Sequence, residues 1–176
     1  MQEGGFDAEQ AAAHRRGMVL SAIAGALMVA QLVLLFIIGR DHLPALKLVG
    51  YASWLGGAVL GWLPVLVFRR RGGVGQGRSY VHTTRVVRTG IYSVVRHPQY
   101  LSFYFLVAGL ILIGQHWSIL ALGIVAAVLF TFGLRGADER NLGKFGEEYR
   151  DYMKQVPGYN ILWGFIRRLR RPGDSG

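Results

Sequence analysis

Hydrophobic residues in this chain are gathered into long runs separated by short polar segments. The first run covers residues 17–38 and contains no charged residue, and further runs cover about 45–68, 99–113 and 117–134. About 20 apolar residues in a helix are enough to cross a bilayer, although the third run is shorter. Only residues 114–116 separate the last two runs, which predicts an antiparallel helical hairpin. The pattern therefore predicts an all-α integral membrane bundle of four transmembrane helices.

The residues after the fourth run show a different periodicity. Apolar side chains recur every three or four residues from about Asp138 to Gln155, which predicts an amphipathic helix. The apolar residues of segment 161–166 precede four arginines in 167–171, which predicts a second helix lying on an anionic membrane surface. We expect the first fifteen and the last five residues to be disordered, and the whole chain, residues 1–176, to form one domain.

Charge distribution gives the predicted spans an orientation. The chain carries a net charge of +10, but its Lys and Arg residues lie beside apolar runs, which favours a membrane surface over nucleic acid. Counted on alternate sides of the four spans, eighteen basic residues face two. The positive-inside rule then places both termini and the loop between the second and third spans in the cytoplasm. We expect the cytoplasmic membrane of a bacterium or an archaeon. The chain has no cysteine, which excludes disulfides and thiol nucleophiles, and we predict no metal site.

Residues 90–100, Gly-Ile-Tyr-Ser-Val-Val-Arg-His-Pro-Gln-Tyr, stand at the start of the third span. Pro98 disfavours helical geometry at His97 and suits the first turn of a new helix. The backbone N–H groups that follow it are free at a helix start, and Arg96 adds positive charge there. The arrangement suits an anionic group at the membrane edge. The alternative is a basic turn whose tyrosines anchor the membrane interface.

An acidic pair, Asp138 and Glu139, follows the fourth span, and the short hairpin brings it beside the Arg96–His97 turn. A pocket between these ends would offer cationic donors, a helix N-terminus and two carboxylates, which suits a zwitterionic ligand. The alternative is an exposed arginine–carboxylate pair of little energetic value.

Four segments together resemble the isoprenylcysteine carboxyl methyltransferase family, which is grouped with the phospholipid methyltransferases. They are residues 90–92, 96–100, 138–142 and 145–152, and the resemblance extends over about 83–157. The arginine-histidine-proline element, the acidic pair and the later Phe-Gly-Glu-Glu-Tyr run are specific in combination.

The resemblance implies S-adenosylmethionine as cofactor, bound largely by residues 83–157. It implies catalytic roles for Arg135 and Glu139, of which Glu139 would also contact the cofactor. The first acid is Asp138 where the family has Glu, and segment 142–146 is one residue shorter, which leaves the register of the acids and the arginine open by one. We expect Glu139 to contribute more than Asp138. The implied cofactor-binding residues are Thr84, Arg85, Val86, Val87, Tyr92, His97, Pro98, Gln99, Tyr100, Asp138 and Glu139.

The methyl acceptor stays open at this point. Arg135 could orient a carboxylate, whereas an amine or a thiol would need a base such as Glu139 or His97. We expect a lipid-like or small amphiphilic acceptor, and the sequence leaves the oligomeric state open. Two alternatives to a methyltransferase stay open, an NADPH-dependent membrane reductase of the sterol-reductase type and a non-catalytic membrane protein.

Overall fold

The computed structural model describes residues 3–38, 43–71 and 85–169, and all regular structure in these ranges is helical. This confirms the predicted all-α class. The elements in chain order are α1 (Glu3–Ile38), α2 (Pro44–Arg71), a 3₁₀ turn η2 (Gly90–Ser93), α3 (Pro98–Gly114), α4 (Trp117–Gln155) and α5 (Ile161–Leu169).

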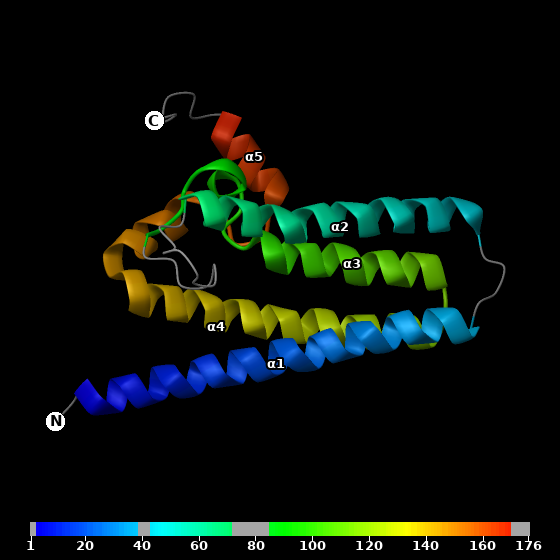
Figure 1. Ribbon diagram of the computed structural model, residues 1–176, viewed down its shortest axis with the longest axis horizontal. Coiled ribbons are helices and arrows are strands. Elements are labelled where there is room, and N and C mark those ends of the chain that lie inside the picture. Colours follow the sequence, from blue (N-terminus) through cyan, green and yellow to red (C-terminus); the bar gives the residue numbers. More distant parts are fainter. Residues whose placement is uncertain (1–2, 39–42, 72–84, 170–176) are drawn as a thin grey trace.

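The four long helices lie side by side in two pairs, α1 with α4 and α2 with α3 (Figure 1). α3 and α4 run antiparallel, and only Gln115 and His116 separate them, which confirms the hairpin. Gln115 adopts a left-handed conformation with φ 43° and ends α3. Its side-chain amide exchanges two 3.1 Å hydrogen bonds with the backbone of Leu43 at the start of α2, so the hairpin turn is fixed to the neighbouring helix.

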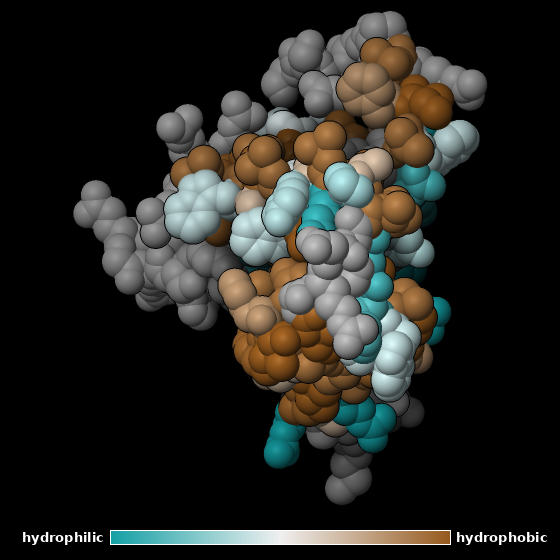
Figure 2. Space-filling view, turned by 90° about the vertical axis from the view of Figure 1, so that its right-hand side faces the viewer, coloured by the Kyte–Doolittle hydropathy of each residue, from teal (hydrophilic) through white to brown (hydrophobic). Residues whose placement is uncertain are grey.

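Three of these helices are long and apolar enough to cross a membrane: Arg15–Ile38 within α1, Pro44–Val67 within α2, and α4. α3 is equally apolar but has only 17 residues. Viewed along the bundle axis, hydrophobic side chains cover much of the outer surface (Figure 2). The part of α4 before Gly146, from Trp117 to Phe145, has 29 residues and is about 43 Å long, so it extends beyond a hydrocarbon core of about 30 Å. Its apolar run ends at Leu134, and the residues that follow lie outside the membrane-spanning part.

Close packing holds the pairs together. Gly57 and Gly61 of α2 face Ser102 of α3, where an added Cβ would meet the Ser102 carbonyl oxygen at 3.0 Å and its hydroxyl oxygen at 2.8 Å. The two glycines therefore permit a helix contact that larger residues would prevent. Between α3 and α4, the rings of Phe103 and Phe130 stack with centroids 4.5 Å apart.

Two features differ from the sequence-based expectation. The first fifteen residues were expected to be disordered, but α1 begins at Glu3. Segment 8–13, Ala-Glu-Gln-Ala-Ala-Ala, consists of strong helix formers that extend the membrane helix outward. The expected disorder of the last five residues lies outside the described ranges.

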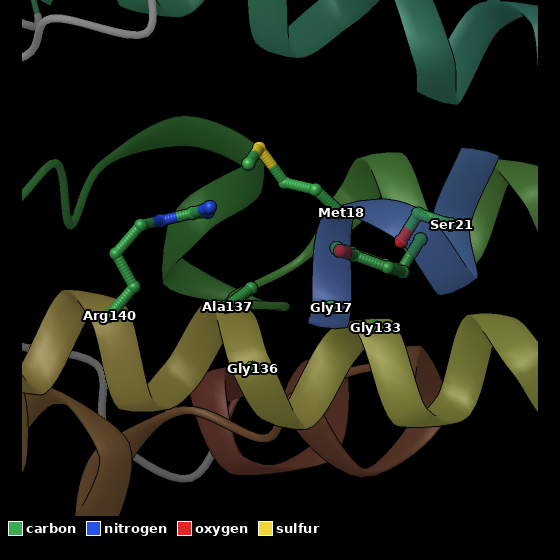
Figure 3. A pocket seen from close by; sticks show the side chains of 8 residues that line it. Gly17, Met18, Ser21, Gly133, Gly136, Ala137 and Arg140 are labelled. Carbon is green, nitrogen blue, oxygen red and sulfur yellow. The ribbon is translucent and has the colours of Figure 1, made fainter. Parts of the chain in front are cut away.

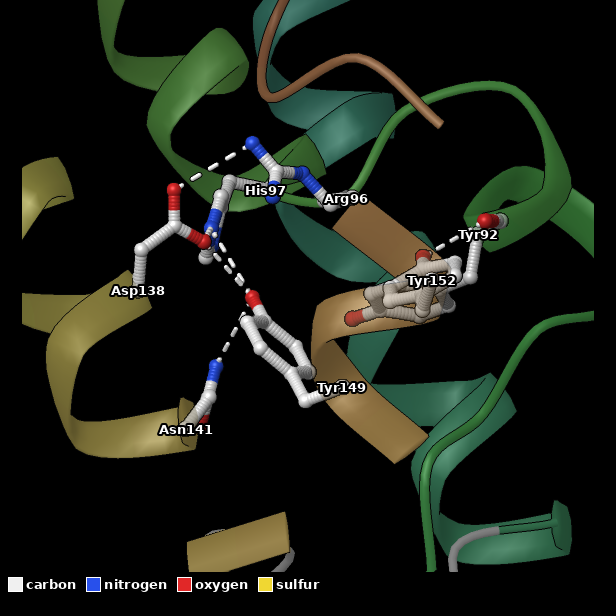
Figure 4. A network of polar contacts seen from close by, with 7 residues as sticks. All are labelled: Tyr92, Arg96, His97, Asp138, Asn141, Tyr149 and Tyr152. Atoms are coloured by element: carbon white, nitrogen blue, oxygen red, sulfur yellow. Dashed lines mark hydrogen bonds and ion pairs between the residues drawn. The ribbon is translucent and has the colours of Figure 1, made fainter. Parts of the chain in front are cut away.

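The second difference concerns the predicted amphipathic helix from Asp138 to Gln155. It is the continuation of α4 and is broken only at Gly146, whose φ of 56° and ψ of −132° are not helical. Side chains rarely tolerate this conformation, and glycine adopts it readily. After Gly146 the chain folds back, so the buried Tyr149 and Tyr152 return toward the start of α3 (Figure 4).

Candidate functional site

Three donors converge on the carboxylate of Asp138 (Figure 4). Nε2 of His97 lies 2.7 Å from Oδ1, and the Tyr149 hydroxyl donates to the same oxygen at 2.7 Å. Nη2 of Arg96 lies 3.2 Å from Oδ2. The side chains of Asp138, His97 and Arg96 are only 17%, 8% and 10% exposed, so this is not the exposed surface pair considered from the sequence. We call Arg96, His97, Asp138 and Tyr149 the polar network.

Local geometry explains how the network forms. Pro98 is the first residue of α3, and the preceding His97 has φ −125° and ψ 66°, outside the helical region. Arg96 and His97 therefore stand at the helix start, as the Pro98 position predicts. Asp138 lies on α4, one turn beyond Leu134. Because the hairpin between α3 and α4 is short, this position lies opposite the start of α3. The fold-back at Gly146 then brings Tyr149 to the carboxylate.

The charge on Asp138 is set by competing effects. Burial raises the pKa of its carboxyl, but the hydrogen bond and charge of His97, the Tyr149 hydroxyl and the Arg96 guanidinium outweigh burial and lower the pKa below its ordinary value. An ionised carboxylate only accepts hydrogen bonds, so Nε2 of His97 carries the proton, and on a neutral ring the lone pair stands on Nδ1. Burial and the Asp138 charge raise the pKa of the Tyr149 hydroxyl, which therefore stays protonated as a donor.

A second set of contacts fixes the fold-back. Nδ2 of Asn141 donates to the Tyr149 hydroxyl at 3.2 Å, which orients that hydroxyl toward Asp138. The buried Tyr152 hydroxyl donates to the backbone carbonyl of Tyr92 at 2.6 Å. These bonds join the second half of α4 to the segment that leads into α3.

Arg96 has hydrogen-bonding capacity that the described part of the chain does not use. Its Nε and Nη1 atoms are buried and have no partner among the described residues. Buried guanidinium N–H groups are normally satisfied, and their fork geometry matches a carboxylate or a phosphate. The N-terminus of α3 also lacks a side-chain cap, which leaves the first-turn N–H groups of Gln99 and Tyr100 without intrahelical acceptors. The site therefore has spare donors suited to an anionic group.

A cavity of about 190 Å³ lies between α1 and α4 (Figure 3). Tyr100 of α3 also lines it, and the ring of Tyr100 meets that of His97 edge-on at 5.9 Å between centroids. The buried Ser21 hydroxyl oxygen has no partner in the described part of the chain, and Met18, which also lines the cavity, is 52% exposed on α1. The lining residues are Gly17, Met18, Ser21, Tyr100, Gly133, Gly136, Ala137 and Arg140.

The structure brings together only part of the predicted site. Of the residues predicted for the cofactor, His97, Pro98, Gln99 and Tyr100 lie at the start of α3, and Asp138 lies in the network.

The loop residues and the remaining charges are placed differently. Val87 is buried, Val86 packs against the cluster of Tyr149, Tyr152 and Val156, Arg85 is exposed, and Thr84 lies outside the described residues. Tyr92 is buried, with its carbonyl bonded to Tyr152.

Arg135 and Glu139, the two predicted catalytic residues, lie apart from the network. Both are exposed, and the Arg135 guanidinium lies over the ring of Phe132 at 5.7 Å. The geometry thus favours Asp138 over Glu139 and Arg96 over Arg135. The sequence pattern placed Tyr149 on the apolar face of an amphipathic helix and did not indicate the hydrogen bond of its hydroxyl to Asp138. Gly146, three residues earlier, was the one indication in this segment that the helix could break there.

One comparison with known proteins bears on this site. Residues 78–142 match the model of the isoprenylcysteine carboxyl methyltransferase (ICMT) family. No curated protein and no solved structure matches the chain. The matched residues include Arg96, His97 and Asp138, and the match confirms the resemblance predicted from the sequence.

Proposed function

We propose that this protein is an integral membrane methyltransferase that uses S-adenosylmethionine to methylate a lipid-like or small amphiphilic acceptor. The family match supports a membrane methyltransferase. The observation that carries the proposal is the buried Arg96 beside ionised Asp138 at the start of α3: two of its N–H-bearing nitrogens have no partner within residues 3–38, 43–71 and 85–169.

The residues fit the charged groups of this cofactor. Nε and Nη1 of Arg96, with the N–H groups of Gln99 and Tyr100, would hold its carboxylate. When bound, S-adenosylmethionine supplies a methyl group attached to a positively charged sulfur. Residues 83–157 would form the cofactor-binding part, and Asp138 keeps Arg96 and His97 in place within it.

The site would suit both a methyl acceptor that needs no base and one that must first lose a proton. A carboxylate needs no base, and the donors beside the cavity, Tyr100 and Arg140, would orient it. An amine or a thiol must lose a proton, for which Nδ1 of His97 would be available when the ring carries a single proton, because Asp138 holds that proton on Nε2. In both cases the residues contribute mainly by orientation and electrostatics.

The membrane arrangement follows from helix lengths and charge. We propose that α3 also crosses the membrane, as the third of four spans and paired with α4, and that the network faces the cytoplasm together with both termini. The eighteen-to-two charge asymmetry supports this orientation. The water-soluble cofactor would then enter from the cytoplasm, and an apolar acceptor would enter from the bilayer through the cavity beside α1.

Binding to the detergent-purified protein tests the proposal. We expect calorimetric titration to detect S-adenosylmethionine, and Arg96→Gln to weaken it about ten- to a hundredfold, the cost of losing charged hydrogen bonds. Arg96→Lys should fall in between, because it keeps a charge for Asp138 but loses the fork. Arg150→Gln is the matched control, since Arg150 is exposed and pairs only with Glu147 among the described residues.

Two further results would contradict the proposal. Binding of NADPH in place of S-adenosylmethionine would indicate a reductase, and binding of neither would indicate a non-catalytic protein. Transfer is tested in membranes containing the protein, where the tritiated methyl group of the cofactor should enter the solvent-extractable fraction. Thermal melts of each variant separate lost binding from lost folding.

A further inference from the structure

The helix α5 carries an apolar surface that none of the described residues covers. Leu162, Trp163, Phe165, Ile166 and Leu169 are between 42% and 75% exposed. A helix of nine residues is marginal in water even with favourable sequence, and exposed leucine and tryptophan add a further cost. We call these five side chains the α5 apolar face.

The charged residues near α5 in the sequence are all basic. Arg167 and Arg168 lie within α5, Arg170 and Arg171 follow in the sequence, and residues 152–173 contain no Asp or Glu. Apolar side chains combined with arginines fit a membrane surface that contains anionic lipid, because the apolar face enters the acyl region while the guanidinium groups meet headgroups. A soluble protein partner would not require apolar side chains and arginines together on the same helix.

The position of α5 agrees with a membrane occupant. α5 lies at the end of the bundle where α2 ends and α3 begins (Figure 1). α1 and α2, which reach the same end, also expose apolar side chains that a bilayer covers, for example Val19 at 50% and Leu66 at 43%. The α5 apolar face therefore lies at an end of the bundle where two long helices also expose apolar side chains.

α5 is also attached to the polar network through the backbone. The N–H of Arg96 donates to the carbonyl of Pro157 and the N–H of His97 to the carbonyl of Gly158, each at 2.9 Å. Gly164 of α5 packs so closely on the carbonyl of Val94 that a Cβ there would collide with it. A displacement of α5 would therefore displace segment 94–97, which includes two residues of the network.

We propose that α5 binds the surface of an anionic membrane, and that this binding holds segment 94–97 in the geometry that binds S-adenosylmethionine. The second half of this inference rests on the proposed function, whereas the first half does not. Anionic lipid would then act as an activator of the site, through Gly164 and the 157–158 backbone bonds.

Membrane docking is tested by thiol accessibility in reconstituted full-length protein. Because the chain has no cysteine, Phe165→Cys introduces a unique probe for a water-soluble maleimide. We expect at least fivefold slower labelling in phosphatidylcholine vesicles containing one-third phosphatidylglycerol than in phosphatidylcholine alone. Salt at 0.5 M should reduce the difference by screening.

Matched variants decide whether the arginines cause this protection. Arg167→Gln with Arg168→Gln should abolish most of it, because each basic residue near an anionic surface contributes about fivefold to association. Arg150→Gln, on α4, should leave it unchanged. Equal labelling in both vesicle types would overturn the docking proposal, and so would protection that is strong in both, which would indicate a cover other than anionic lipid.

Coupling is tested separately by cofactor titration in the same vesicles. We expect S-adenosylmethionine to bind about three- to tenfold more tightly with phosphatidylglycerol present, and Gly164→Ala to lose this gain while its labelling protection remains. Equal affinity in both lipids, with protection intact, would overturn the coupling. Absence of cofactor binding in both lipids would overturn the proposed function, while the labelling result would still decide the docking.

Discussion

Replacing Asp138 by Asn removes the negative charge on which Arg96, His97 and Tyr149 converge. The amide oxygen of Asn can still accept one of the two bonds now made to Oδ1. The amide nitrogen is a donor and cannot pair with Arg96. The variant therefore leaves a guanidinium 10% exposed without its only anionic partner among the described residues.

The magnitude follows from these contacts. Hydrogen bonds to charged groups contribute about 1.5–3 kcal/mol each, and breaking a buried ion pair by removing one partner costs about 3–5 kcal/mol. The 17% exposure of Asp138 lets water replace part of the loss. We expect a destabilisation of about 2–4 kcal/mol, which corresponds to a fall in melting temperature of about 5–15 °C.

Thermal melts in one detergent, read by intrinsic fluorescence, measure this effect. Glu139→Gln is the matched control, because it neutralises the adjacent acid on the same helix, where the side chain is exposed. Surface changes of this kind usually alter stability by less than about 0.5 kcal/mol. Equal melting of Asp138→Asn and the native protein would refute the network, and a larger loss in Glu139→Gln would restore the predicted importance of that residue.

Three other outcomes follow from the same geometry. Because folding lowers the pKa of Asp138, the stabilisation from its carboxylate is complete above the ordinary Asp pKa of about 3.9 and is lost as the pH falls through the lowered value. The difference in melting temperature between the native protein and Asp138→Asn should therefore be constant from about pH 6 to 5 and shrink below about pH 4. A difference that stays constant at all pH values would contradict this. Tyr149→Phe removes a hydrogen bond to a charged carboxylate, so we expect the free energy of unfolding in chemical denaturation to fall by about 1.5–3 kcal/mol. Tyr152→Phe removes a hydrogen bond to a neutral carbonyl, and we expect a fall of about 1 kcal/mol. The reverse order would argue against an ionised Asp138. Gly146→Ala places a side chain at φ 56° with open space around it, so backbone strain alone should cost about 1–3 kcal/mol and weaken the Tyr149 contact; native-like melts would show that the fold-back tolerates a Cβ.

The sequence predicts the spans and the hairpin because they depend on quantities that are visible locally. Apolar run length specifies a membrane helix regardless of its neighbours, and a connection as short as residues 114–116 leaves no choice but an antiparallel pair. Pro98 similarly determines where α3 begins, and Gly57 with Gly61 marks a close helix contact.

The choice between Asp138 and Glu139 could not be predicted in this way. Adjacent residues on a helix point about 100° apart, so only one of them can face His97. Which of the two faces His97 depends on how α4 is rotated about its axis relative to α3. The sequence does not specify this rotation, because apolar residues occur on all sides of the helix. The fold-back at Gly146 was equally hidden, because glycine permits a break without requiring one, and Tyr149 reaches Asp138 only through it.

The length of α3 has a consequence for bilayer thickness. Its 17 residues span about 25 Å, whereas the 24-residue apolar segments of α1 and α2 span about 36 Å and a hydrocarbon core about 30 Å. With the Gln115 end of α3 at one boundary, the His97 end stops about 5 Å short of the other. A bilayer of average thickness would have to thin around this end of α3 so that the ion pair of Arg96 and Asp138 stays at its boundary, in contact with headgroups and water. Short-chain lipids would therefore match this end of the bundle better than long-chain lipids.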